Sequence, residues 1–473
     1  MAVNTGKKKR LSAALIGIAL LAGCSMAPKY VRPDTPVEAA FPQGEAYRRD
    51  LSGAPRVEEL TWRQFFGDEK LIKVIALALE NNRDLRAAVL NVEQARALYG
   101  IQRSEMLPNV GVSAAGSRQR VPADISPSGR RRISESYSVN LGLLSWEIDF
   151  FGRLASLKDE ALEEYLASEE GRRAAQISLI SSVANTWLTL AADRENLKLA
   201  RSTLVAQKAT CDMIRQRYEV GIASELDLRQ VQTQVDTARV NEALYLRLAA
   251  QDKNALDLLA GTTVGEELLP ADLGEVKPLR EVAAGLSSEV LFNRPDILRA
   301  EHQLKAANAY IGVARAAFFP RISLTATVGR ASAELSGLFK NGHSAWNLAP
   351  QASLPVLDPR TWYALKASKA QQKIAVTQYE KTVQSAFREV ADTLAARGTM
   401  DTQLKAQTAL VAASERTYKL YDLRYRLGAD SYLGVLDAQR SLYAAQQNLV
   451  AVRLAKLTSQ VLLYAALGGG CDL

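Results

Sequence analysis

The chain has 473 residues, of which 48% are hydrophobic and 23% are charged, and its formal net charge is +8. Four of the positive charges fall in the leader, at Lys7–Arg10, and the +4 that remains on the mature chain forms no basic tract. A thin, scattered positive charge does not favour nucleic-acid binding, and export from the cytoplasm would exclude it.

The N-terminus predicts a secretory signal that ends at a lipidation site. The basic run Lys7–Arg10 precedes the mostly apolar Leu11–Gly23, which is shorter than the roughly 20 residues that a membrane-spanning helix needs. An uncleaved N-terminal anchor is the alternative. The letters LLAGC resemble the lipobox of bacterial lipoproteins, which implies cleavage before Cys24, a diacylglycerol on its sulfur and a fatty acid on its nitrogen. Because Ser25 follows, rather than the Asp that would suggest retention in the inner membrane, we expect the outer membrane of a Gram-negative cell.

The mature chain contains one pattern twice. The stretches RYEVGIASEL (Arg217–Leu226) and RYRLGADSYL (Arg424–Leu433) share R-Y-x-x-G-x-x-S-x-L at a spacing of 207 residues. Upstream, a constant spacing of 212 relates Asp84, Ala88, Ala95, Ala97, Arg103 and Pro108 to Asp296, Ala300, Ala307, Ala309, Arg315 and Pro320. We therefore predict two tandem repeats, each running helix, strand pair, long helix, tight turn, long helix.

Long stretches without proline predict the helices of each repeat. Leu154–Tyr218 could form one helix of about 65 residues, roughly 100 Å long. The helix that follows shows apolar residues at alternating spacings of three and four, which indicates the heptad seam of a coiled coil. Its ten positions are Leu228, Val231, Val235, Ala238, Glu242, Tyr245, Ala249, Asp252, Leu256 and Leu259.

The shared motif falls at the turn between the two long helices of each repeat. Gly221 and Gly428 suit the left-handed position that ends a helix. Ser224 or Ser431 can cap the helix that follows. We call the two turns and these four residues the tips.

Four segments between the helices alternate apolar with small or polar residues, as β-strands do. They are Asn109–Val121, Ser136–Leu144, Arg321–Ala333 and Ala345–Leu357, and their lengths suit transmembrane strands. A soluble sheet with one wet face would look similar. No second apolar run reaches the length of a membrane-spanning helix, so a membrane crossing would use these strands. Four strands cannot close a barrel: two copies would give eight strands and a filled interior, and three would give twelve and an open lumen.

The mature chain, from CSMAPKYVRP to LYAALGGG, resembles the TolC-like outer-membrane factors, and within them the lipoprotein branch typified by OprM. The stretches that carry the resemblance are WRQFFGDEKL, ALENNRDLRAAVLNVEQARA, RPDILRAEHQLKAANAYIGVARAAFFPRISLTA, AFREVADTLAARGT and YLGVLDAQRSLYAAQQ. The resemblance implies an α+β membrane protein: a homotrimer with a 12-stranded outer-membrane β-barrel, four strands per chain, continued by a long periplasmic coiled-coil barrel with a mixed equatorial domain. The expected segments are a signal peptide (1–23), an N-terminal anchor and equatorial segment (24–70), repeat 1 (71–268), a linker (269–285), repeat 2 (286–467) and a C-terminal tail (468–473).

The resemblance also implies that the tips, with Gly221, Ser224, Gly428 and Ser431, contact the periplasmic adaptor and that a gate lies at the periplasmic mouth. By position, Leu433 and Asp437 would face the channel axis and Arg440 would brace a neighbour, while Tyr425 and Asp227 would tie inner to outer helices. An ordinary solvated helix carboxylate is the alternative for Asp437.

The gate region departs from the TolC pattern at two positions. TolC-type tips carry a second Asp and a basic bracing residue, where this chain has Gly434 and Asp430. We therefore expect a single ring of acidic residues at the gate, and different contacts holding the gate closed.

No pattern in the chain indicates catalysis, so we do not expect an enzyme. Its two histidines, His302 and His343, lack metal-ligand spacing, and we expect both to be exposed to solvent and no metal to be bound. Walker A, G-x-S-x-G and G-x-G-x-x-G motifs do not occur. Cys211 and Cys471 are expected to be free thiols, with a disulfide between them as the alternative.

The leading hypothesis for function is the outer-membrane channel of a tripartite multidrug efflux pump that exports small amphipathic compounds. Its expected partners are two further copies of the chain, a periplasmic adaptor (membrane fusion) protein, an inner-membrane proton-driven transporter and outer-membrane lipid. An exit duct for type I protein secretion would use the same architecture. A lipid-tethered periplasmic coiled-coil adaptor is the alternative from another class, and it would need no lipid-facing strands.

Overall fold

The structure is a computed structural model that describes residues 25–47, 55–283 and 287–470. The chain divides into two compact units. The sheet unit contains the described part of Met1–Asp34, together with Asn91–Ser168 and Arg299–Tyr379. The helical unit contains the described parts of Thr35–Leu90, Glu169–Leu298 and Glu380–Leu473.

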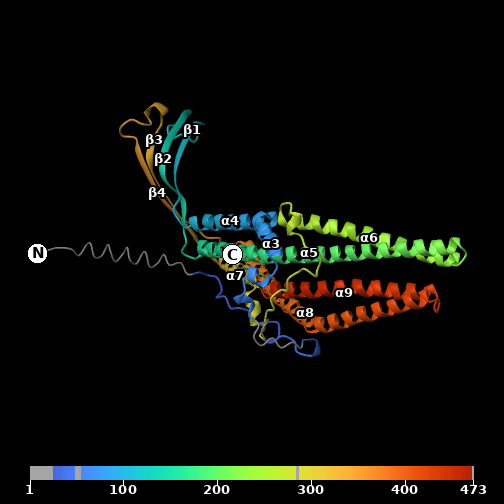
Figure 1. Cartoon of the computed structure of the whole chain (residues 1–473). Helices are drawn as coiled ribbons and strands as arrows, with labels where there is room; N and C mark the ends of the chain where they lie inside the picture. The colour runs from blue at the N-terminus through green and yellow to red at the C-terminus, as the bar shows by residue number, and fades with distance from the viewer. Residues whose placement is uncertain (1–24, 48–54, 284–286, 471–473) are drawn as a thin grey trace. The chain divides into compact units, whose positions relative to one another are not determined.

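The predicted order of elements is present in both repeats. Repeat 1 contains α4 (Arg83–Ser104), β1 (Val110–Val121), β2 (Arg132–Ile148), α5 (Arg153–Glu219) and α6 (Glu225–Ala260). Repeat 2 contains α7 (Pro295–Ala316), β3 (Arg321–Ser332), β4 (Ser344–Ser353), α8 (Pro359–Arg426) and α9 (Tyr432–Ala466). The long helix predicted over Leu154–Tyr218 is confirmed, and Figure 1 shows α5 pairing with α6 and α8 with α9.

Shorter elements precede and connect the repeats. They are η1 (Glu45–Tyr47), η2 (Val57–Glu59), α2 (Trp62–Phe65), α3 (Glu69–Asn81), η3 (Glu266–Leu268), η4 (Ser288–Asn293) and η5 (Leu335–Gly337). The start of α3 is capped by Asp68, whose carboxylate accepts hydrogen bonds from the backbone N–H groups of Lys70 and Leu71.

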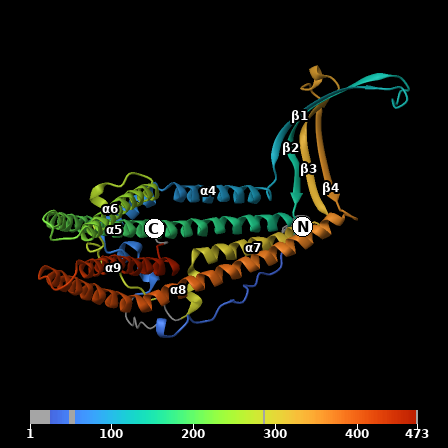
Figure 2. The same ribbon diagram turned by 90° about the vertical axis from the view of Figure 1, so that its right-hand side faces the viewer.

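The four strands form one antiparallel sheet in the order β1-β2-β3-β4, seen side by side in Figures 1 and 2. Each predicted strand is present, but the predicted bounds of two strands were wrong by four residues. β2 runs four residues further at each end than Ser136–Leu144. Near its C-terminal end an irregularity between Leu143 and Trp146 interrupts the alternation that sequence reading relies on. β4 ends at Ser353 rather than Leu357, just before Pro355, which has no N–H to donate.

The register sorts side chains onto two different faces of the sheet. One row of partners runs Val112, Leu141, Val328 and Trp346, and its end members are 71% and 79% exposed. The neighbouring row, which points to the opposite face, runs Gly111, Gly142, Thr327 and Asn347. The sheet therefore presents a bulky apolar face and a small or polar face, and within the described residues of one chain β1 and β4 each have one edge without a partner strand.

The core of the helical unit holds the N-terminal elements against the end of α9. The Phe65 and Tyr464 rings stack with their centroids 4.1 Å apart, and the Tyr464 hydroxyl donates to the carbonyl of Leu60. Among the described residues, α9 is long and apolar enough to cross a membrane. This corrects the expectation that no apolar run after the signal segment reaches the length of a membrane-spanning helix. Length and composition alone are weak evidence for a membrane span, and α9 contributes many side chains to this core.

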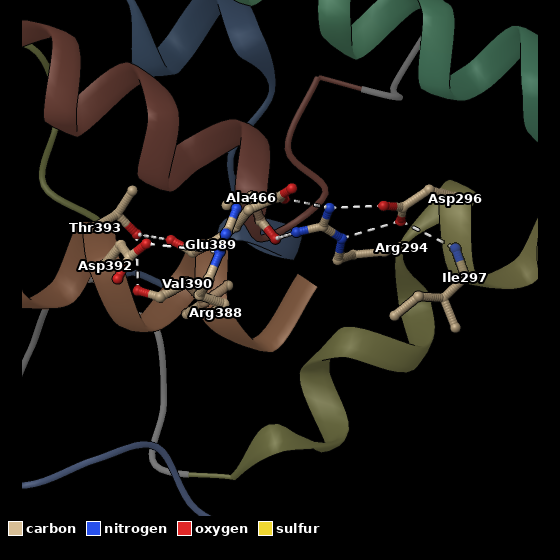
Figure 3. A network of polar contacts seen from close by, with 9 residues as sticks. All are labelled: Arg294, Asp296, Ile297, Arg388, Glu389, Val390, Asp392, Thr393 and Ala466. Carbon is tan, nitrogen blue, oxygen red and sulfur yellow. Dashed lines mark hydrogen bonds and ion pairs between the residues drawn. The ribbon is translucent and has the colours of Figure 1, made fainter. Parts of the chain in front are cut away.

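In both repeats, a side chain just before the first helix donates a hydrogen bond to a backbone carbonyl near the end of the last helix, but the donor residue differs. Asn82, just before α4, donates to the carbonyl of Leu259 near the end of α6 at 2.9 Å. Its counterpart 212 residues later, Arg294, donates to the carbonyl of Ala466 at the end of α9 at 2.7 Å. Figure 3 shows that the same guanidinium also reaches Asp296 and Glu389, at 2.7 and 2.8 Å. One planar group thus joins the start of α7 to α8 and α9.

We expect Arg294→Lys to lower the free energy of unfolding by about 1–3 kcal/mol, because the compact ammonium lacks the planar fork with which the buried guanidinium reaches its three acceptors together. Arg388→Lys is the matched control, since the Arg388 side chain is 76% exposed and lies 3.9 Å from Asp392. Urea unfolding of the purified protein measures both. Equal midpoints for the two variants would contradict the role of Arg294.

Candidate channel mouth at the helix turns

Both tips end their first helix as predicted. α5 ends at Glu219, and Gly221 adopts a positive φ of 77°, the left-handed conformation that glycine tolerates best. α8 ends at Arg426, and Gly428 has the same φ of 77°. In each turn a backbone N–H bonds back to the arginine of the R-Y motif, from Ile222 to Arg217 and from Ala429 to Arg424. The two turns are therefore built alike.

The caps that follow the turns differ. Ser224 and Asp227 form a reciprocal capping box at the start of α6, as predicted for Ser224. Ser431 occupies the equivalent position before α9, but its side chain makes no capping bond, so that prediction was wrong. The residue that would complete the box is Gly434, which has no carboxylate. A Cβ there would lie 2.7 Å from two ring atoms of Tyr421, so an Asp cannot be placed at this position without moving the ring.

A hydrophobic cluster beneath the tips joins all four long helices. Tyr425 of α8 packs edge to face against Tyr432, a member of the cluster, with ring centroids 5.1 Å apart. Because the cluster takes side chains from both helix pairs, the pairs are packed together here. Its buried members are Leu204, Cys211, Ile214, Val231, Val235, Ala238, Tyr432, Val435 and Leu436.

Polar bonds link the two helix pairs along their length. Nearest the tips, Arg217 donates to the Tyr425 hydroxyl at 3.1 Å and lies over its ring. Further along, Arg440 donates to Gln234 at 3.2 Å. Two more links join α9 to repeat 1, from Gln447 to Tyr245 at 2.9 Å and from Arg453 to Glu195 at 2.7 Å.

The structure places Tyr425 between the helix pairs of one chain, where it accepts a hydrogen bond from Arg217. It places Arg440 in contact with Gln234 of the same chain, whereas the resemblance implied that Arg440 would brace a neighbour. Asp227 differs, because its carboxylate bonds to Ser224 of its own helix cap. Sequence reading missed the partners Arg217 and Gln234. Arg217 could have been found, since it is the arginine of the repeated R-Y motif.

Leu433 and Asp437 lie one helical turn apart on α9, and both are exposed, Leu433 to 60%. Asp430, which stands where TolC-type tips carry a basic residue, pairs with Arg424 in its own turn. That guanidinium holds the pKa of Asp430 below its usual range. The charge of the Asp430 carboxylate is therefore balanced by Arg424 in the same turn. Asp437 is the exposed acidic residue of α9.

Two carboxyl groups meet between α5 and α6, at a seam position where an apolar residue is usual. Burial, and the neighbouring charge of Asp252, raise the pKa of Asp193 to about 6. The pKa of Asp252 is also raised by burial, and its bond with Asp193 opposes that rise. The nearby Tyr245 has a raised pKa for the same reasons, burial and the charge of Asp193. Near neutral pH the pair is therefore strained by like charge.

The expectation that both histidines would be exposed was wrong. His302 is partly buried and bonds to Glu163 at 2.6 Å. His343 is also partly buried, near the carbonyl of Ala331. Cys211 is a buried free thiol, whereas Cys24 and Cys471 lie outside the described residues. Within the described ranges, no group of three or more His, Cys, Asp or Glu is arranged to hold a metal.

We expect Asp193→Asn to remove a pH dependence of stability. Because the folded-state pKa is raised from 3.8 to about 6, the parent protein is stabilised at low pH and loses that stability as pH rises through about 6. The variant should be more stable than the parent at pH 8 by about 1 kcal/mol, after allowance for solvent screening. Urea unfolding between pH 5 and 8 measures this.

Asp236→Asn is the control, since Asp236 is exposed and pairs with Arg239 on the surface of α6. A pH profile of Asp193→Asn that matches the parent's would show that the carboxyl pair does not titrate as described.

Comparison with known proteins agrees with this geometry over nearly the whole chain. The sequence profile described as "Outer membrane efflux protein" matches residues 74–262 and 286–469. The chain is 49% identical to the antibiotic efflux pump outer membrane protein ArpC of Pseudomonas putida, over 95% of this chain and 93% of that protein. It is equally similar, at 49% and with the same coverage, to a toluene efflux pump outer membrane protein, TtgC, of the same species.

Its fold matches the open state of the Neisseria gonorrhoeae MtrE outer membrane channel, with a TM-score of 0.84 and 38% identity over 95% of this chain and 99% of that one. The architecture is that of a trimeric outer-membrane channel, to which each chain contributes four strands and two pairs of long helices. The chain belongs to the outer membrane efflux protein family and is an outer-membrane efflux channel.

Proposed function

We propose that three copies of the chain form the outer-membrane duct of a tripartite pump, which exports small amphipathic compounds from the periplasm. The observation that carries this proposal is the sheet with two unlike faces and two open edges. Lipid can accept the row of Val112, Leu141, Val328 and Trp346, whereas an aqueous lumen suits the row of Gly111, Gly142, Thr327 and Asn347. Unpaired edges are not tolerated in lipid, so neighbouring copies must pair with them.

The other components of the pump are proposed from the tips and from the relatives. Val220, Ile222 and Leu427 at the two turns are 69–75% exposed, which suits docking of a periplasmic adaptor. The names of the relatives pair an outer-membrane protein with antibiotic or toluene efflux, and both are consistent with small, partly apolar cargo. A proton-driven inner-membrane transporter would supply the energy, because a duct of this kind conducts passively.

The two alternatives fit less well. A periplasmic adaptor would gain nothing from a sheet whose bulky apolar face is exposed. A protein-secretion duct would share the fold, and the relatives' names favour efflux over it.

The proposed gate combines an apolar constriction and a ring of acids. Around a threefold axis, Leu433 would form a ring that resists wetting, and three Asp437 carboxylates would attract cations. The links from Arg217 to Tyr425 and from Arg440 to Gln234 hold α8 and α9 against α5 and α6, so opening would require breaking them. The closed and open states of the gate would then be two different packed arrangements of the helix pairs.

Replacing Leu433 and Asp437 together with Ala should raise the resting conductance of purified trimers in planar bilayers and weaken their block by trivalent cations. The matched control replaces Val240 and Asp236, which share the same four-residue spacing on the exposed face of α6. If the conductance and block of the gate variant equal those of the control, Asp437 is a solvated helix residue and the gate lies elsewhere.

We also propose that Cys24 carries the lipid anchor. The residues after it run along α7 in the opposite direction, where Arg315 donates to the carbonyl of Met26 at 2.9 Å and Asn308 to that of Pro28 at 2.7 Å. Arg32 ends this contact in an ion pair with the buried Glu301. Since β3 begins five residues after α7 ends, the chain just after Cys24 is held near the start of a membrane strand. A lipid there would lie within reach of the bilayer.

Cys24→Ser should abolish incorporation of labelled palmitate while Cys471→Ser leaves it unchanged. The barrel can still hold the Cys24→Ser protein in the membrane, so the label rather than localisation is the readout. Label on the Cys24→Ser protein would contradict the anchor.

A further inference from the structure

The hairpin of β1 and β2 continues beyond the rest of the sheet. The last residue of β3, Ser332, pairs with Tyr137 of β2, and the residue of β1 at the same step is Gly116. Beyond that step, among the described residues, β1 and β2 pair only with each other. Figure 2 shows this part of the hairpin past the ends of β3 and β4. We call residues 117–136 the outer arm, because the opposite ends of the strands join the periplasmic helices.

The apolar face of the sheet ends where the outer arm begins. Up to that step, the residues of β1 on this face are Val110, Val112, Ala114 and Gly116. Those of β2 are Leu143, Leu141, Val139 and Tyr137. The next cross-strand pair on the same face is Arg118 and Glu135. Both strands therefore change from apolar to charged residues at the same step of the ladder.

The length of the apolar run matches the height of a membrane. Arg118 lies eight residues after Val110, which is roughly 27 Å along the strand and about 20 Å across the membrane at the tilt of barrel strands. The lipid-facing band of such barrels is about 25 Å tall and ends in amphipathic aromatic rings. Tyr137 has such a ring, and its hydroxyl donates to Glu135 at 3.3 Å. In a membrane barrel, Arg118 would thus lie at the level of the lipid headgroups.

The outer arm carries an excess of positive charge that the register divides between the two faces. Arg120 pairs with Ile133 and lies on the apolar face with Arg118, whereas Arg132 pairs with Val121 and lies on the opposite face. The arm as a whole carries two acids, Asp124 and Glu135, and five arginines, Arg118, Arg120, Arg130, Arg131 and Arg132.

The apolar face has two guanidinium groups and one carboxylate at this level. Arg118 pairs with Glu135 at 2.9 Å, and 68% of the Arg118 side chain remains exposed. Within the described residues, no hydrogen bond or ion pair engages the side chain of Arg120. Two residues apart on one face of a strand, the two arginines begin about 7 Å from each other, so both can reach one ligand.

A phosphate group is the anion that suits this arrangement. The guanidinium fork binds phosphate oxygens through two parallel hydrogen bonds, and long arginine side chains can place that fork at the headgroup level. Ile133, the partner of Arg120, is 59% exposed on the same face and offers an apolar contact beside the charges. Two positive groups next to an exposed apolar side chain fit a phosphate that is attached to acyl chains.

We propose that Arg118 and Arg120 of each chain bind the phosphate of an anionic lipid headgroup in the outer leaflet, with Ile133 against the upper part of the acyl chains. The inference rests on the proposed trimeric barrel, whose apolar face meets lipid, and adds which lipid that face selects. Arg132 points to the lumen and takes no part. One lipid is then held by each chain of the trimer.

Native mass spectrometry of the purified full-length trimer counts the bound lipid, with dioleoyl phosphatidic acid as the probe. Arg118→Gln/Arg120→Gln should remove one tightly held lipid per chain and weaken its binding roughly tenfold or more, because charge-assisted hydrogen bonds are lost. Arg120→Gln alone, which leaves the pair of Arg118 and Glu135 intact, should weaken binding in the same direction. The matched control, Arg131→Gln/Arg132→Gln, removes the same charge from the same arm and should leave binding unchanged.

Two further arms test the face and the source of the phosphate. Ser117→Arg/Gln119→Arg, added to Arg118→Gln/Arg120→Gln, returns the charge to the opposite face of β1 and should not restore binding. Dioleoyl phosphatidylcholine, whose phosphate is balanced by its own choline cation, should bind the parent more weakly than phosphatidic acid. Inorganic phosphate at the same concentration should not displace phosphatidic acid.

Migration of unboiled samples reports assembly independently. A parent protein without trimers would contradict the proposed assembly, whereas trimers with an unaltered lipid count in Arg118→Gln/Arg120→Gln would contradict the lipid site alone. If the control loses as much lipid as that variant, or if arginines on the opposite face restore binding, the net charge of the arm attracts lipid and the proposed site is wrong. Displacement by inorganic phosphate would equally overturn the proposal.

Discussion

The constraint on which the structure depends is the pairing of backbone groups in a sheet that one chain cannot close. β1 and β4 each leave an edge open, and the sheet exposes Val112, Leu141, Val328 and Trp346 on one face. In lipid an unpaired N–H or C=O costs several kcal/mol, so the edges must be covered by strands of other copies. Oligomeric assembly is then a condition for a stable membrane sheet, and a lumen lined by small and polar residues follows from it.

The long helices outside the sheet also depend on contacts between the two repeats. Duplication supplies two similar helix pairs, and the polar links from Arg217, Arg440, Gln447 and Arg453 hold the pairs together. The two repeats differ both at the ends of their last helices and at their tips. Asn82 is matched by Arg294, and the capping box of Ser224 and Asp227 has no counterpart beside Gly434. The second pair therefore lacks one stabilising cap at the turn that carries the proposed gate.

Sequence reading predicted the repeats, the long helices, the left-handed glycines and the strands, because each leaves a local and periodic signal. All ten seam positions from Leu228 to Leu259 are buried or partly buried. It failed where the outcome depends on distant partners. The Ser431 side chain makes no capping bond, and His302 was misjudged because Glu163, 139 residues away, pairs with it. The pair of Asp193 and Asp252 was visible only as a polar residue at a seam position.

The central claim is that neighbouring copies pair with the free edges of the sheet, and amide hydrogen exchange in the detergent-extracted assembly tests it most directly. If the barrel is closed, the amides of β1 and β4 should be as strongly protected as those of β2 and β3, which are paired within the chain. Rapid exchange along β1 and β4, with slow exchange confined to β2 and β3, would contradict the account.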